Sequence, residues 1–179
     1  MVIQNVKQPV TPRFFILYVF PLLTWVGLIY FSSSQSYEDQ NVQPILEDFP
    51  LEWVEKIAEP ISFTYGDSVI SLETRTPAAF VEFFLRKGAH LFAFAVMGLL
   101  AYRVFDFFIR KRRYSAITAW LFVTLYASID EFRQLLHPNR TGMVEDVILD
   151  SVGGMLGISA IIIWRKWRTA RRVQRQTSS

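Results

Sequence analysis

The residues of this chain that could do chemistry are eight polar side chains in three short stretches. They are Lys87, His90, Asp130, Glu131, Gln134, Arg140, Asp146 and Asp150. Each stretch lies in or beside a strongly apolar segment, where an ionisable side chain is costly to bury. Ionisable residues in such a setting are candidates for a functional site.

Three of the eight have side chains that act in acid–base catalysis. Histidine changes its charge near neutral pH, so we expect His90 to serve as a general acid or base. A nearby carboxylate tunes the protonation of an imidazole, and we expect Asp130 to do so here. Glu131, next to Asp130 in the chain, is the third catalytic candidate.

The other five are candidates for ligand binding. Lys87 and Arg140 would hold an anionic group such as phosphate or carboxylate. Gln134 would hydrogen-bond the same substrate. Asp146 and Asp150 would hold a divalent cation such as Mg²⁺ through oxygen ligands, although their spacing alone forms no metal-binding motif.

The charges of this set do not balance. Four carboxylates face two fixed cations, Lys87 and Arg140. A network that only held helices together should be near neutral, whereas a site for a cation or a cationic ligand group needs surplus negative charge. The imbalance favours a functional site, and an interhelical network stays the alternative.

The segments that carry these residues are long and apolar. Of the 179 residues, 51% are hydrophobic and 16% are aromatic. Four segments, residues 14–31, 88–109, 114–136 and 143–164, approach the roughly 20 apolar residues that cross a bilayer. The first lacks a small-residue cleavage site, so we expect it to be retained. We predict an all-α fold, a bundle of four transmembrane helices in a single domain, residues 1–179.

Two compositional features exclude other classes of protein. The chain has no cysteine, which excludes disulfides, thiol catalysis and thiolate metal sites. The Lys and Arg residues lie at the ends of the apolar segments, which indicates membrane topology and argues against binding of nucleic acid.

Lys and Arg prefer the cytoplasmic ends of membrane segments. Arg13 precedes the first segment, Lys111 and its three arginine neighbours link the second and third, and the basic tail 165–179 follows the fourth. Both termini are then cytoplasmic, and the acidic segment 32–86 is extracytoplasmic. Within it, "PLEWVEKIAEPI" predicts a short amphipathic helix at the membrane interface. The eight candidate residues then lie at one depth near the outer surface.

Helical geometry indicates which side chains face other helices. Asp146, Asp150, Gly153 and Gly157 align on one face of the fourth segment. Small residues spaced four apart mark close approach of transmembrane helices, so both aspartates should point toward a neighbouring helix. Arg133 should point elsewhere, into solvent.

The same residues carry a family resemblance. The stretches "FSSSQS", "RKGAHLFAFAVMGLL" and "SIDEFRQLLHPNRTGMVEDVILDSVGGMLG" resemble the VanZ-like family of bacterial integral membrane proteins, over about Phe14 to Trp164. That family has Lys-x-x-His on its second span, Asp-Glu-x-x-Gln at the end of the third, an Arg in the next loop and two polar residues with glycines on the fourth. The eight candidate residues match these positions, and Asp150 matches one that often holds Asn. The resemblance implies a location in the bacterial cytoplasmic membrane, and the family's namesake is associated with low-level resistance to teicoplanin.

We therefore expect an outward-facing polar site that binds or modifies a lipid headgroup or a cell-envelope precursor, with membrane lipids around it. An effect on teicoplanin susceptibility is implied by the resemblance alone. The alternative is a non-catalytic envelope factor or scaffold that docks a partner protein. A small transporter fits less well, because we expect no ionisable residue in the middle or inner half of the bundle, where an ion relay would need one.

Overall fold

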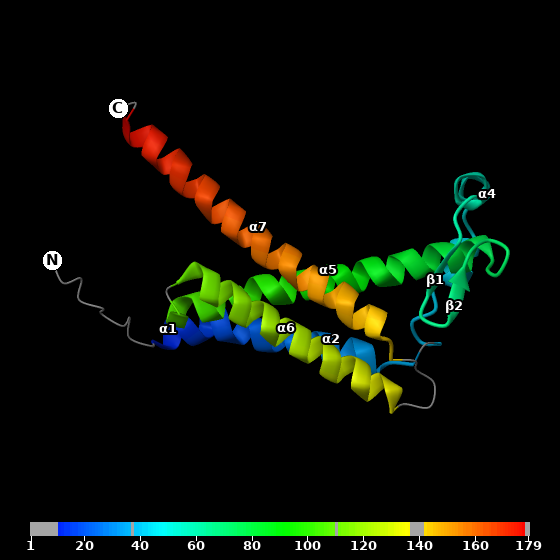
Figure 1. The fold of residues 1–179 in the computed structure, drawn as a ribbon, viewed down its shortest axis with the longest axis horizontal. Helices are drawn as coiled ribbons and strands as arrows, with labels where there is room; N and C mark the ends of the chain where they lie inside the picture. Colours follow the sequence, from blue (N-terminus) through cyan, green and yellow to red (C-terminus); the bar gives the residue numbers. More distant parts are fainter. Residues whose placement is uncertain (1–10, 37, 110, 137–141, 178–179) are drawn as a thin grey trace.

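The computed structural model describes residues 11–36, 38–109, 111–136 and 142–177. Four long helices form a bundle: α2 (Phe20–Ser34), α5 (Pro77–Ile109), α6 (Arg112–Leu135) and α7 (Val144–Thr177) (Figure 1). Each of α5, α6 and α7 packs against the other two, and α2 packs on α5 and α6. The helical bundle agrees with the predicted architecture.

Three helical runs are long and apolar enough to cross a membrane: Pro12–Ser34, Pro77–Ile109 and Val144–Arg172. The chain thus has the helices of a membrane protein. Helix α6 is less apolar because it carries charged residues near both ends, and serine, threonine and tyrosine residues interrupt its apolar ones. Its crossing of the membrane, and hence the count of four spans, stays a prediction.

The first apolar run contains a change of helix type. It begins with α1 (Pro12–Phe14) and the π-helical turn η1 (Phe15–Val19), and continues as α2. Pro21 has no N–H to donate to the carbonyl four residues earlier, and the wider π turn lies just before it.

Helix α5 begins well before the predicted span 88–109. Pro77 suits the first helical turn, and the Thr76 hydroxyl accepts a hydrogen bond from the Ala79 N–H at 3.2 Å. At about 1.5 Å per residue, α5 is about 50 Å long, against about 30 Å for the hydrocarbon core of a bilayer. Residues 77–86 of the predicted outer segment therefore form the first turns of α5, and their location outside the membrane stays a prediction.

The segment between α2 and α5 has a small core of its own. It contains α3 (Gln43–Glu47), α4 (Glu52–Ala58), β1 (Phe63–Tyr65) and β2 (Ser68–Ile70). The buried residues are Val54, Ala58, Ile70 and Phe80, the last on α5. The predicted amphipathic helix exists as α4, and the segment is anchored on the first turns of α5.

The strands β1 and β2 form a hairpin that the sequence did not predict. They pair antiparallel, with Phe63 opposite Ile70 and Tyr65 opposite Ser68. Gly66 in the turn has φ +57°, a left-handed conformation that glycine adopts without strain. The fold is mostly helical, and this hairpin is an addition to the predicted all-α architecture.

Glycines bring α5 and α7 into close contact. A Cβ atom on Gly153 would lie 2.5 Å from the Leu91 carbonyl oxygen, and one on Gly157 would lie 1.7 Å from that of Ala95. This contact confirms the predicted close approach along that face of α7. Beyond the crossing, α7 diverges from the other helices (Figure 1).

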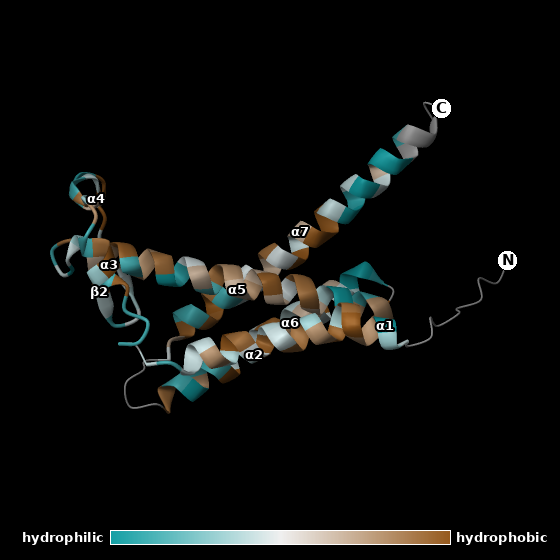
Figure 2. Ribbon diagram, turned by 180° about the vertical axis from the view of Figure 1, so that it is seen from behind, coloured by the Kyte–Doolittle hydropathy of each residue, from teal (hydrophilic) through white to brown (hydrophobic). Residues whose placement is uncertain are grey.

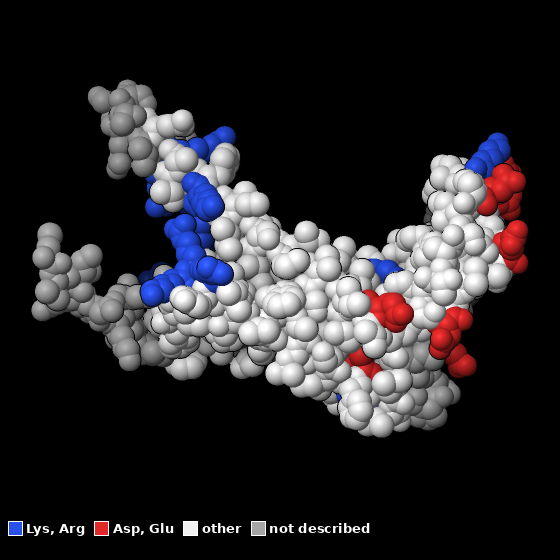
Figure 3. All heavy atoms as spheres, viewed as in Figure 1, with Lys and Arg blue, Asp and Glu red and all other residues white. Residues whose placement is uncertain are grey.

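Charge and hydropathy divide the bundle along its length. Apolar residues cover the middle of the helices, and hydrophilic ones dominate the last turns of α7 (Figure 2). In Figure 3, most Lys and Arg lie over one end and most Asp and Glu over the other. We call these the basic end, which carries Lys111, Arg112, Arg113, Arg165, Lys166 and Arg168, and the polar end, where α2 and α6 end and α5 and α7 begin.

Candidate functional site

An ion pair joins Lys87 of α5 to Asp146 in the first turn of α7 at the polar end. The Lys87 ammonium lies 2.5 Å from Oδ1 of Asp146. The Tyr65 hydroxyl donates a hydrogen bond of 2.5 Å to the same oxygen, and the Lys87 ammonium lies 4.6 Å from the centre of the Tyr65 ring. Strand β1 thus contributes a residue to the contact between the two helices.

Tyr65 remains a hydrogen-bond donor over a wide pH range. Burial raises the pKa of the Tyr65 phenol, and its hydrogen bond to the Asp146 carboxylate raises that pKa further. Proton loss from the phenol would place two anionic oxygens side by side. The contact therefore keeps the phenol neutral.

One helical turn deeper, His90 faces Asp150. His90 Nδ1 lies 3.6 Å from Asp150 Oδ1, which is an ion-pair distance but too long for a hydrogen bond. Asp150 is 1% exposed, and its Oδ1 has no hydrogen-bond partner. The expectation that Asp130 is the carboxylate beside His90 is wrong, because α7 and not α6 lies against this face of α5.

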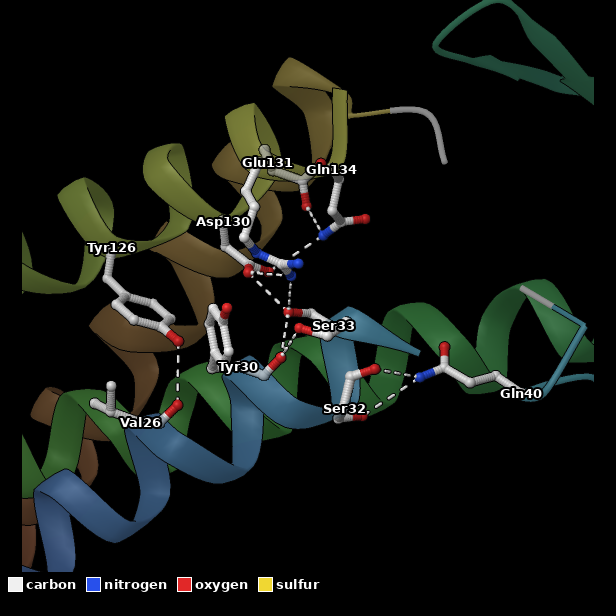
Figure 4. Close-up of polar contacts among 11 residues, drawn as sticks. Val26, Tyr30, Ser32, Ser33, Gln40, Tyr126, Asp130, Glu131 and Gln134 are labelled. Carbon is white, nitrogen blue, oxygen red and sulfur yellow. Dashed lines mark hydrogen bonds and ion pairs between the residues drawn. The ribbon is translucent and has the colours of Figure 1, made fainter. Parts of the chain in front are cut away.

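Asp130 instead belongs to a network between α6 and α2 (Figure 4). The Ser33 hydroxyl donates to Asp130 Oδ1 at 2.7 Å, and the Arg133 guanidinium lies 3.0 Å from the same oxygen. Arg133 also donates to the Ser33 hydroxyl at 2.6 Å. The prediction that Arg133 points into solvent is wrong, since one helical turn brings its side chain back onto Asp130.

Glu131 and Gln134 extend this network toward α7. The Gln134 amide donates to Asp130 and to Glu131, both at 3.2 Å. The second Glu131 oxygen accepts a hydrogen bond of 2.9 Å from the Met143 N–H, just before α7 begins. All three predicted residues of α6 are thus buried and connected.

The structure bears differently on the residues predicted to bind a ligand and on those predicted to bind a metal ion. Arg140 lies outside the described residues. Lys87 is already held by Asp146. In the described part of the chain, no group of three or more His, Asp or Glu side chains could hold a metal ion. Asp146 and Asp150 face Lys87 and His90, and their binding of a divalent cation stays an untested prediction.

A cavity of about 570 Å³ opens between the end of α2, the segment after it and α5. Its walls change character along the helices. Ile29, Ala93 and Phe94 line the part deeper in the bundle, whereas Ser33 and His90 line the part nearer the polar end. Gln35, Asp39, Gln40, Glu82 and Arg86 complete its outer rim.

The rim is held together by hydrogen bonds to a buried carboxylate. Arg86 lies 2.8 Å from Glu82, and the Gln43 amide donates to the other Glu82 oxygen at 2.6 Å. These contacts fix the segment after α2 against α5 and thereby shape the cavity mouth.

Sequence reasoning did not single out Ser33, Tyr65 or Arg133 as members of the site. Two of them carried a signal: Ser33 lies in the serine run "FSSSQS" at the end of an apolar segment, and Arg133 stands three residues after Asp130. Nothing comparable indicated Tyr65, which reaches Asp146 through the hairpin.

The basic end also carries charges within the helices, contrary to expectation. Asp106 of α5 pairs with Arg165 of α7, and Arg103 lies one turn away. The described residues of α5 between His90 and Arg103 include no ionisable side chain other than Tyr102. About 20 Å of helix therefore separates the polar residues of the two ends. The gap still argues against a continuous ion relay.

Comparisons with known proteins give one positive finding. A family model described as VanZ/LLP1 matches residues 15–165. This match confirms the resemblance drawn from the motifs. Neither the curated proteins nor the solved structures gave a match.

Proposed function

Since this chain belongs to the VanZ/LLP1 family, we propose that its polar end binds a lipid-anchored molecule of the cell envelope, with the headgroup at the cavity rim. The observation that carries this proposal is the graded wall of the cavity. Its deep part is apolar and suits a hydrocarbon chain, and its mouth offers hydroxyl, amide and charged groups that suit a headgroup.

The rim favours a polar headgroup with hydrogen-bonding groups. Ser32 and Gln40 line it, together with the Asp39 carboxylate and the Arg86–Glu82 ion pair. Lys87 is paired with Asp146 and is not among the residues that line the cavity, which supports a role in positioning α5 against α7. The predicted role of Lys87 as a direct ligand-binding residue stays untested.

His90 is the residue through which the site would do chemistry. Its Nδ1 faces Asp150 and its side chain lines the cavity, so we propose Nε2 as the nitrogen that meets the ligand. A carboxylate that orients a histidine is a common arrangement for a general base. Modification of the bound molecule would use His90 in this role, whereas binding alone would not require it.

The membrane orientation follows from the charge distribution. Lys and Arg gather at the basic end, so we place that end in the cytoplasm, together with both termini, and the polar end at the outer surface. The cavity mouth then faces the compartment in which envelope precursors are assembled.

A second candidate function rests on the exposed apolar residues of the outer segment. Phe49, Trp53 and Ile57 are each more than half exposed. Exposed aromatic and aliphatic side chains close together are typical of protein-binding surfaces. A non-catalytic factor that docks a partner protein would use this surface and leave the cavity unoccupied.

A complementation experiment separates the two functions. Ala89 is exposed and lines the cavity, so Ala89→Trp should fill the cavity without displacing packed side chains. Leu125→Trp places the same ring on an exposed position of α6 away from the cavity and serves as the control. Each variant is introduced into a strain that lacks the gene, and teicoplanin susceptibility and extracted envelope precursors are measured.

We expect Ala89→Trp to behave like the deletion and Leu125→Trp to behave like the wild type. Full complementation by Ala89→Trp would contradict the proposal and favour the docking function, which does not use the cavity.

A further inference from the structure

A second cleft lies at the basic end of the bundle. It has a volume of about 520 Å³, and Tyr18, Leu99, Arg103, Ile161, Trp164 and Arg165 line it. The cleft exists because α7 diverges from α5 beyond the glycine crossing (Figure 1). It is separate from the cavity at the polar end.

The cleft holds a cation that no carboxylate neutralises. Among the residues that the structure describes, Arg103 forms no ion pair, and its guanidinium lies 4.9 Å from the centre of the Tyr18 ring. Arg165 also lines the cleft, but Asp106 neutralises it. The cleft therefore carries net positive charge inside an apolar helix bundle, where an uncompensated cation is costly.

Arg103 lies near the end of α5 at the basic end of the bundle. It lies six residues before the end of α5 at Ile109, which is about 9 Å along the helix axis. A long arginine side chain can carry its guanidinium from that depth toward the phosphate layer. Tyr18 and Trp164 are of the residue types that gather at the membrane interface.

A further cation lies against one of the residues that line the cleft. The Arg168 guanidinium lies 4.7 Å from the ring centre of Trp164, which itself lines the cleft and is half exposed. Planar guanidinium groups bind phosphate oxygens in pairs and with defined geometry. Basic pockets between membrane helices are suited to the headgroups of anionic lipids.

We propose that this cleft is a binding site for the phosphate group of an anionic phospholipid from the adjacent leaflet, with Arg103 as its main contact. The lipid lies between α5 and the diverging half of α7 and neutralises the cation within the bundle. This site is independent of the ligand at the polar end. The alternative ligand with the same chemistry is free phosphate from solution.

The test is thermal unfolding of the purified full-length protein in detergent, with increasing amounts of phosphatidylglycerol, phosphatidylcholine or inorganic phosphate. The expected result is a rise in the unfolding temperature with phosphatidylglycerol that the other two do not reproduce. Arg103→Gln should raise the half-saturating concentration of phosphatidylglycerol roughly tenfold, as expected for the loss of one charge-assisted contact. Arg113→Gln, at an exposed arginine of the same end outside the cleft, should match the wild type.

Three results would overturn the proposal. Phosphatidylcholine could stabilise as well as phosphatidylglycerol, free phosphate could account for the whole effect, or Arg103→Gln could respond like the wild type. If Arg103→Gln does not fold, Arg103→Lys decides the matter, because it keeps the charge but loses the planar fork. Its response to phosphatidylglycerol should be weaker than that of the wild type, and an unchanged response would also overturn the proposal.

Discussion

The two aspartates of α7 have the same charge but different surroundings. Asp146 accepts hydrogen bonds from Lys87 and Tyr65, so its charge is neutralised by contacts that the fold has already made. Asp150 is more deeply buried, and its Oδ1 has no hydrogen-bond partner. Asp146 thus belongs to a structural ion pair, whereas Asp150 is a buried carboxylate with an oxygen that lacks a hydrogen-bond donor.

The structural ion pair gives the first prediction. Asp146→Asn leaves the Lys87 ammonium without its carboxylate, so the free energy of unfolding should fall by about 1–3 kcal/mol. Thermal unfolding in detergent measures the change. The double variant Lys87→Met with Asp146→Asn should lose less than the sum of the two single variants. Additive losses would show that the two side chains do not stabilise each other.

The second prediction concerns Asp150. Asp150→Asn replaces a buried, incompletely partnered charge with a neutral side chain of the same shape. We expect the thermal unfolding temperature to be unchanged or higher and the complementing activity to be lost. A variant that unfolds, or one that complements fully, would assign Asp150 to the structural network.

How far the sequence predicted the site is clearest for these same residues. Topology and helix lengths were enough to bring Lys87, His90, Asp130 and Asp150 to one end of the bundle. They were not enough to pair them, because pairing depends on which helix faces α5. That order is set by the glycine contact with α7, and the aspartate beside His90 is therefore Asp150.

At the scale of the helices, the contact between α5 and α7 determines the geometry of the polar end. Gly98 packs on the backbone of Gly154, and Gly157 packs on the backbone of Ala95. The close approach fixes how α5 and α7 are turned toward each other. At the polar end, this orientation brings Lys87 to Asp146. Without room for backbone contact, the helices would separate and the ion pair would lengthen.

The third prediction tests this contact with one methyl group. Gly157→Ala would place a Cβ atom 1.7 Å from the Ala95 carbonyl oxygen, so the two helices must move apart and the unfolding temperature should fall clearly. Gly88→Ala is the matched control, because nothing lies within 4 Å of the added atom. The control should be neutral or stabilising by about 0.5–1 kcal/mol, since alanine favours helix over glycine. Equal effects of the two substitutions would show that the crossing does not depend on glycine.

The helices also show where a sequence pattern stops being informative. Hydropathy locates apolar runs, but it cannot show that α5 continues for three more turns before residue 88, because those turns are stabilised by packing on Val54, Ala58 and Ile70. Hydropathy also gave no signal for the hairpin at Gly66. Its strands are three residues long, too short for an alternating pattern to be recognised.

At the scale of the whole molecule, the separation of charge along the bundle is the basis of the proposed membrane orientation. Basic residues gather at the end where α7 finishes, and acidic ones at the end that carries the outer segment (Figure 3). From the positive-inside rule we propose that the cavity mouth lies outside the cytoplasm. Arg113 lies at the start of α6, and Glu145 lies beyond its other end, in the first turn of α7. The two residues are on opposite sides of the membrane only if α6 crosses it.

The fourth prediction uses the absence of native cysteine, which removes background labelling. Single substitutions Asp48→Cys and Glu145→Cys should react with a membrane-impermeant thiol reagent in intact cells. Arg113→Cys and Ala170→Cys should react only after the cells are permeabilised. The reverse pattern would place the cavity on the cytoplasmic side, and labelling of both Arg113→Cys and Glu145→Cys from outside would show that α6 does not cross.

The central claim is that the graded cavity at the polar end holds a lipid-anchored molecule. The most direct measurement is mass spectrometry of the molecules that remain bound when the protein is extracted from bacterial membranes into lipid nanodiscs and purified. Wild type, Ala89→Trp and Leu125→Trp are compared, and all three keep Arg103, so lipid bound at the basic end is the same in each. We predict that one class of lipid-linked molecule copurifies with the wild type and with Leu125→Trp and is depleted in Ala89→Trp. Equal amounts of every molecule in the three samples would contradict the claim.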